Sequence, residues 1–197
     1  MFAIHNTFPK EMAVIGRILV DYGELEVDLV ICVQVARSFD LNGTLKAMFR
    51  VRGETNRIDV ADGLGRSSYV AANLGTEFDT MIKAIRQCLR FRNKYAHAIW
   101  HDPDSGKNLC YVSLEELAKE PDDVPDLKAL TFFFIDEALL LQQETFFEYA
   151  RSLISYVNAQ GQANRAGLRR QYQPPTPVAP PAFYTRKTQL KKPLNQP

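Results

Sequence analysis

Apolar residues recur at intervals of three and four over most of this 197-residue chain, which is the spacing of one face of an α-helix. Between Pro9 and Phe39 two seven-residue apolar rows run together, as they do at the seam of a helical bundle. These rows are Ile15, Tyr22, Leu29 and Ala36, and Ile18, Leu25, Cys32 and Phe39. A similar row within residues 132–158 consists of Phe132, Leu139, Phe146 and Leu153, flanked by Ile135, Ala150 and Val157. We therefore expect the chain to be all-α, with residues 1–160 forming an up-and-down helical bundle.

A third long helix is expected in the middle of the chain. The sequence Thr76-Glu77-Phe78-Asp79 resembles a capping box, which marks a helix start. Residues 101–106 are typical of a turn, so this central helix should end near Trp100. Residues 109–112 are β-prone, and we expect them to form a small β-hairpin with residues 98–101.

The segments between the long helices are less regular. Residues 45–51 predict a short helix, and residues 58–69 predict a second one that Gly63 and Gly65 weaken. Residues 63–68 lack the preceding strand and the lysine of a phosphate-binding loop, so we interpret them as a turn or a frayed helix. Residues 115–128 are acidic and contain two prolines, which indicates a loop with at most one helical turn.

The last 37 residues differ in composition from the rest. Residues 161–197 contain seven of the eleven prolines, seven cations and no acid, which leaves 17 cations against 23 acids, a net charge of −6, for residues 1–160. Pro174, Pro177 and Pro180 keep the three-residue repeat of a polyproline II helix. We expect this basic tail to be disordered and dispensable for the fold. It is either a solvated tail or a binding segment, which would bind a groove of a protein partner or would bind RNA nonspecifically.

The cysteines and the amino terminus indicate a cytoplasmic protein. Cys32, Cys88 and Cys110 lie among apolar neighbours without metal-type or redox-type spacing, so we expect reduced thiols in the core. No signal peptide is recognisable, and no run of about 18 apolar residues predicts a membrane span.

A charged residue interrupts the apolar face of the central helix. The stripe through Ile85, Cys88 and Leu89 reaches Arg92, where an apolar residue would be expected. Because a buried unpaired charge is costly, Arg92 requires a carboxylate, an anionic ligand or a wet cleft. Another flank of the same helix carries Arg86, Arg90, Asn93 and His97. His97 lies roughly 140° around the helix from Arg92, so either the helix distorts near its end or two copies of it face each other.

The sequence Arg92-Asn93-Lys94-Tyr95-Ala96-His97 resembles the R-x4-6-H signature of the HEPN superfamily, in which a polar residue often follows the arginine. A Gly-Glu-Leu-Glu run at residues 23–26 and the all-helical pattern are similar to that family. The resemblance covers residues 8–158 as architecture and six residues as motif. It implies a small helical bundle, commonly a homodimer, and in many members a metal-independent endoribonuclease. Some HEPN toxins carry a tyrosine two residues after the histidine, and Ile99 at that position argues against that subgroup.

Such a ribonuclease needs a base, an acid and a group that stabilises the crowded phosphorane. His97 is the candidate base or acid, because imidazole titrates near neutral pH. Arg92 is the candidate for the phosphorane, since its planar fork bonds two oxygens, and Asn93 would orient the imidazole or donate to phosphate. Arg86, Arg90 and Lys94 are the predicted RNA-binding cations. The resemblance implies that the site forms at a dimer interface and needs neither metal nor cofactor.

A non-catalytic alternative uses the same residues. In it, Arg92 pairs with a carboxylate of the first helix, such as Glu24 or Glu26, and His97 caps the end of the central helix. The protein would then be a HEPN-like interaction or nucleotide-sensing module.

A metal site is the third alternative. His97 and His101 are spaced at i and i+4, and Asp102 and Asp104 follow them. No glutamate lies between the histidines, and the helix is expected to end before His101. We therefore predict no metal site, and no serine or cysteine nucleophile motif is visible.

Overall fold

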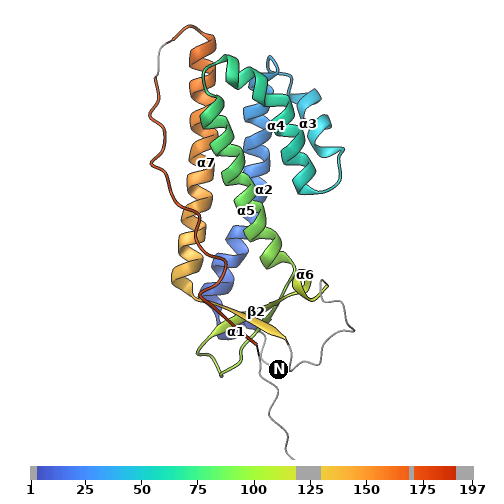
Figure 1. The fold of residues 1–197 in the computed structure, drawn as a ribbon, viewed down its shortest axis with the longest axis vertical. Helices are drawn as coiled ribbons and strands as arrows, with labels where there is room; N and C mark the ends of the chain where they lie inside the picture. Colours follow the sequence, from blue (N-terminus) through green and yellow to red (C-terminus); the bar gives the residue numbers. More distant parts are fainter. Residues whose placement is uncertain (1–3, 119–129, 169–170, 190–197) are drawn as a thin grey trace, which may run out of the picture. The chain divides into compact units, whose positions relative to one another are not determined.

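A computed structural model describes residues 4–118, 130–168 and 171–189, and it is predominantly helical with one small antiparallel sheet (Figure 1). The helices are α1 (Ile4–Thr7), α2 (Pro9–Ala36), α3 (Leu41–Phe49), α4 (Glu54–Ala71), α5 (Gly75–Ala96), α6 (Leu114–Leu117) and α7 (Glu137–Arg165). The strands are β1 (Ala98–His101), β2 (Leu109–Ser113), β3 (Thr131–Ile135) and β4 (Arg186–Gln189). The predicted helical class is thus confirmed, and a sheet larger than the predicted hairpin accompanies it.

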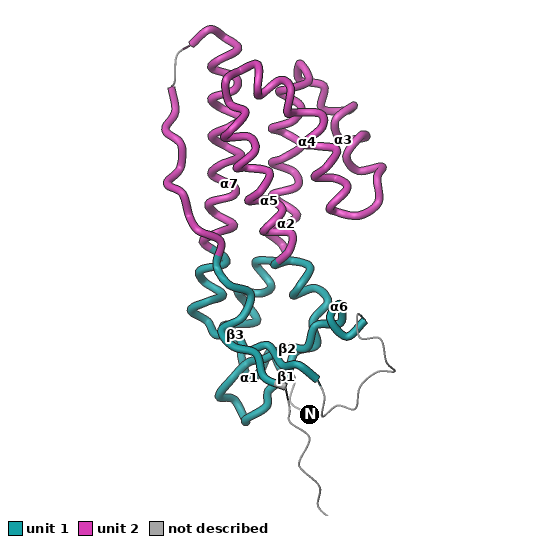
Figure 2. The backbone as a smooth tube through the Cα atoms, viewed as in Figure 1, with its two compact units in different colours: residues 1–19, 91–144, 181–197 teal, residues 20–90, 145–180 magenta. Residues whose placement is uncertain are grey.

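The chain forms two compact units, each built from segments that are distant in sequence (Figure 2). Unit 1 comprises residues 1–19, 91–144 and 181–197, and unit 2 comprises residues 20–90 and 145–180. Helices α2, α5 and α7 each contribute residues to both units. This division differs from the boundary after residue 160 that composition predicts.

Unit 2 is a helical assembly held together by an apolar core. Its largest fully buried side chains include Leu25, Leu29, Tyr69, Phe78 and Ile85, which come from α2, α4 and α5. Leu25 and Leu29 belong to the heptad rows predicted for α2, and Phe78 and Ile85 belong to the apolar stripe predicted for α5. Phe39, the predicted last residue of one row, instead lies beyond the end of α2 and is 64% exposed. Tyr69 also donates its hydroxyl to the carbonyl oxygen of Cys32 at 2.8 Å, which satisfies a polar group inside this core.

Unit 1 contains the sheet, whose strand order is β1-β2-β3-β4 with every neighbouring pair antiparallel. The predicted hairpin is confirmed, because Ala98 pairs with Ser113 and His101 pairs with Cys110. One face of the sheet carries an aromatic row, in which Trp100 pairs with Tyr111 and Tyr111 pairs with Phe133. Tyr95 of α5 contacts the rings of Trp100 and Tyr111, with centroids 5.6 and 6.1 Å away. The end of the central helix is therefore anchored to this face of the sheet.

The start of the last long helix and the end of the central helix differ from the prediction. Phe132 and Ile135 were expected in the last long helix but lie in β3, and α7 begins at Glu137. Residues 132–134 are three phenylalanines, which suit a pleated, half-buried strand. The helix starts after them because Asp136 Oδ1 accepts a hydrogen bond from the Leu139 amide at 2.8 Å, as an N-cap residue does. The central helix ends at Ala96 instead of Trp100, because residues 98–101 pair with β2.

The expectation of a disordered tail is not met where the structure describes the tail. Helix α7 continues to Arg165, and β4 (Arg186–Gln189) adds a fourth strand to the sheet beside β3. The amides of Gln171 and Tyr172 both donate to the Gln160 side chain at 3.0 Å. Composition hides this order because the tail's few aromatic residues include Phe183 and Tyr184, which pack in unit 1 against Phe91 and Phe133. The predicted loop at 115–128 starts with the single-turn helix α6, and residues 119–129 lie outside the described part.

Gly63 and Gly65 both lie within α4, where a turn or frayed helix was expected. A β-carbon at Gly65 would lie 2.8 Å from the ring of the buried Phe78, whereas a β-carbon at Gly63 would meet nothing within 4 Å. Gly65 is therefore needed for close helix packing, and Gly63 is not.

These two glycines give a matched prediction. We expect Gly65→Ala to lower the free energy of unfolding by about 1–3 kcal/mol because it overpacks the core. Gly63→Ala should raise the same quantity by up to about 1 kcal/mol, because alanine is the better helix former. Urea denaturation of both variants measures the difference. Equal effects at the two positions would show that α4 does not pack as described.

Candidate functional site

Asn93 connects the two ends of the R-x4-H motif. Its side-chain Oδ1 accepts a hydrogen bond from Arg92 Nη1 at 2.9 Å, and its backbone oxygen accepts one from the His97 amide at 3.2 Å. Arg92 and Asn93 lie in the last turns of α5 and are both half-buried. The guanidinium of Arg92 is therefore hydrogen-bonded to the next residue of its own helix, and the role predicted for Asn93 beside the imidazole stays a prediction.

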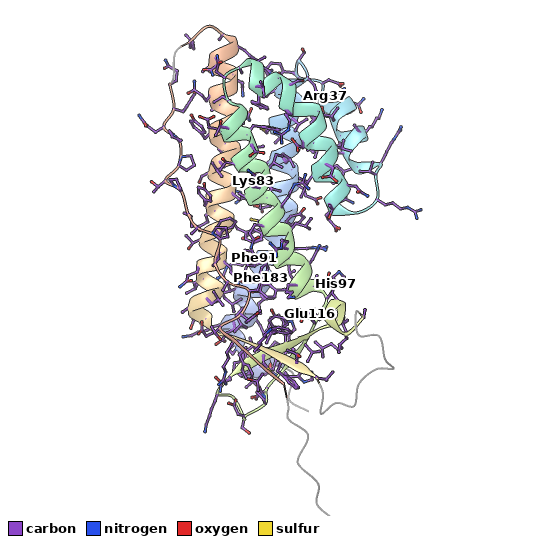
Figure 3. All side chains as sticks on the ribbon, viewed as in Figure 1. Arg37, Lys83, Phe91, His97, Glu116 and Phe183 are labelled. Carbon is purple, nitrogen blue, oxygen red and sulfur yellow. The ribbon has the colours of Figure 1, made fainter. Side chains whose placement is uncertain are left out.

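His97 is the first residue after α5, and its side chain is exposed (Figure 3). Its amide is fixed by Asn93, and its carbonyl oxygen accepts a hydrogen bond from the Leu114 amide at 3.3 Å. The backbone at His97 is thus tied both to α5 and to the start of α6. The helix therefore stops one residue before His97, and a single turn residue carries the imidazole.

Lys94 has a partner that sequence reasoning missed. Its Nζ lies 2.6 Å from Glu116 Oε1 of α6, and only 17% of the Lys94 side chain is exposed. The ammonium also lies 5.4 Å from the ring centroid of Phe133. The ion pair joins α5 to α6 beside His97, so Lys94 has a structural contact in addition to the RNA-binding role predicted for it.

Tyr95 is the buried residue of the motif. It is 3% exposed, and its hydroxyl is hydrogen-bonded to Oε1 of Gln143, a fully buried residue of α7. Burial raises the pKa of Tyr95 well above its ordinary value, so the hydroxyl remains a neutral donor. Gln143 Nε2 in turn donates to the carbonyl oxygen of Ala182 at 2.6 Å. The signal for Gln143 was a polar residue at a core position of α7, between Leu139 and Phe147.

The other predicted cations and carboxylates belong to unit 2. Arg86 Nη2 lies 2.7 Å from Asp59 Oδ1, and Arg90 donates to Gln87 Oε1 at 3.1 Å. Glu26 pairs with Arg57 at 3.0 Å, and Glu24 pairs with Arg151. The two carboxylates proposed as counter-ions of Arg92 thus neutralise other arginines, and RNA binding by Arg86 and Arg90 stays a prediction.

The thiols offer no nucleophile. Cys32, Cys88 and Cys110 are free and buried, as expected. Burial raises the pKa of the Cys32 thiol to about 12 and that of Cys110 to about 11, so neither forms a thiolate near neutral pH.

Metal sites and membrane-spanning helices are both absent from the described residues. There, no three His, Cys, Asp or Glu side chains converge as a metal site would require. His101 lies in β1, so it is not one helical turn from His97 on a common helix. Within the same part of the chain, no helix is long and apolar enough to cross a membrane.

Comparisons with family models, with curated proteins and with solved structures gave no match to this chain.

Proposed function

We propose that this protein is a metal-independent endoribonuclease of the HEPN type, with Arg92 and His97 as its catalytic residues. The observation that supports this most is the double contact of Asn93, which holds Arg92 through its side chain and His97 through its backbone. Four residues lie between the arginine and the histidine, yet both are hydrogen-bonded to one asparagine. The exposed imidazole and the held guanidinium are the two groups that RNA transesterification needs.

In the proposed reaction the 2′-hydroxyl oxygen of a ribose attacks the adjacent phosphorus. His97 accepts the proton of that hydroxyl, and Arg92 donates hydrogen bonds to the phosphorane oxygens as negative charge builds on them. The bond from phosphorus to the 5′-oxygen then breaks, and a protonated imidazole returns a proton to that oxygen. The products are a 2′,3′-cyclic phosphate and a 5′-hydroxyl.

The homodimer is part of the proposal. Base and acid must act on opposite sides of the phosphorus, and one imidazole on one turn serves one side at a time. Two facing copies of the α5 end would supply two His97 side chains, one for each role. Light scattering should then give about twice the chain mass of 22.4 kDa, and a monomer at tens of micromolar would remove the composite site.

The test of the function is incubation of the purified protein with labelled single-stranded RNA in excess EDTA. We expect cleavage to proceed, because no step uses a metal. Intact RNA after long incubation at micromolar protein would favour the non-catalytic interaction or nucleotide-sensing module.

A further inference from the structure

The C-terminal strand segment, defined here as residues 181–189, lies against the same part of unit 1 as the motif. Thr185 donates its amide to the Phe134 carbonyl oxygen at 2.8 Å, and β4 continues the pairing from there. The ring of Phe183 lies 4.8 Å from that of Phe91, one residue before Arg92 (Figure 3). Phe183 lies 92 positions after Phe91 in the sequence, yet its segment contacts the helix that carries the motif.

A chain of two hydrogen bonds joins the motif to this segment. Tyr95, which lies between Arg92 and His97, bonds to the Gln143 side-chain oxygen, and the Gln143 amide nitrogen bonds to the Ala182 carbonyl. Gln143 is completely buried and Tyr95 is 3% exposed, so water cannot replace these partners. The Gln143 side-chain oxygen thus bonds to α5, and its side-chain nitrogen bonds to the strand segment.

We propose that Tyr95 and Gln143 are positioning residues that couple the geometry of the R-x4-H turn to the docking of residues 181–189. The proposal rests on the proposed function for its catalytic consequence. The Tyr95 hydroxyl fixes the rotation of the last helical turn, and the Asn93 contacts depend on that rotation. The strand segment holds Gln143 in the orientation that keeps its oxygen toward Tyr95. Displacement of the segment would release Gln143, and the turn would lose its anchor.

The experiment compares Tyr95→Phe, Gln143→Met and the double variant. Each single change leaves a buried polar group without its partner, so stability should fall in both. The double change removes both partners of the Tyr95 bond, so stability should recover toward wild type, while the Ala182 carbonyl is exposed and can bond to water. Because misplacement of a catalytic group by about 1 Å costs up to 10²-fold, we expect kcat to stay roughly 10- to 100-fold low in the double variant with KM little changed.

A merely structural role predicts the opposite for the double variant: kcat would recover together with stability, and that result would overturn the proposal. Tyr69→Phe is the matched control, because it removes a buried tyrosine hydroxyl that bonds to Cys32 in unit 2. It should lower stability and leave kcat unchanged.

A second readout does not require activity. Gln143→Met should speed amide hydrogen exchange at Thr185, and Tyr95→Phe should shift the imidazole resonances of His97, whereas Tyr69→Phe should change neither. If wild type cuts no RNA but the Thr185 exchange rate and the His97 resonances both change, the coupling holds and the proposed function fails. If RNA is cut but neither the Thr185 exchange rate nor the His97 resonances change, the coupling fails and the proposed function stands.

Discussion

Replacing His97 with alanine is expected to lower the rate of RNA cleavage roughly 10²- to 10⁴-fold, because the reaction loses a positioned proton-transfer group. Arg92→Ala should cause a loss of similar size, since nothing else in the motif donates two parallel hydrogen bonds to a phosphorane. Arg92→Lys should recover little, because an ammonium cannot make the two-pronged contact. Initial rates on a labelled RNA measure all three variants.

Folding controls separate this expectation from a structural role for Arg92. Both alanine variants should keep their helical circular dichroism and their oligomeric state. Lys83→Ala removes a cation whose side chain is 74% exposed in unit 2 and should not change the rate. If Arg92→Ala instead destabilises the protein by about 3–5 kcal/mol, the arginine belongs to a buried ion pair and the non-catalytic module is the better account.

Truncation after Pro180 is expected to lower the free energy of unfolding by roughly 3 kcal/mol or more. The truncated chain loses the apolar contacts of Phe183 and Tyr184, each half-buried. It also leaves the buried Gln143 amide without its acceptor, which costs about 1–3 kcal/mol. Urea denaturation followed by circular dichroism measures the change.

Lys187→Ala is the control for that truncation, because it changes the charge of an exposed β4 residue and keeps the strand. Its effect should stay within about 0.5 kcal/mol. Equal stabilities of the truncated and full-length proteins would mean that residues 181–189 are a dispensable tail, as composition alone suggests.

The sequence predicts the helical part of the fold well because helical periodicity is a local signal. Most residues of the heptad rows of α2 and of the stripe of α5 are buried, Phe39 being exposed, and the hairpin after α5 pairs as expected. The start of α7 was misplaced because Phe132 and Ile135 fit a seven-residue row as well as they fit a strand. A short apolar run does not distinguish a helix from a strand, and here pairing with β2 stabilises the strand.

The residues of the candidate site come from the motif alone, and their contacts could not be predicted from it. Arg92, Asn93 and His97 follow from six consecutive letters, whereas Glu116, Gln143 and Ala182 reach the motif from 22 to 87 residues away in the chain. No local pattern links such positions. Strand β4 was not predicted for the same reason, since it is defined by a partner strand more than 50 residues earlier. The polar Gln143 on an apolar helix face was the one signal available.

The chemical nature of the new RNA ends tests the central claim most directly. RNA cut by wild type in excess EDTA should carry a 2′,3′-cyclic phosphate and a 5′-hydroxyl, as mass spectrometry of the fragments would show. A substrate with 2′-deoxyribose at the cleavage position should remain intact, and so should RNA treated with His97→Ala. Fragments with a 3′-hydroxyl and a 5′-phosphate, or cleavage that EDTA abolishes, would contradict the account.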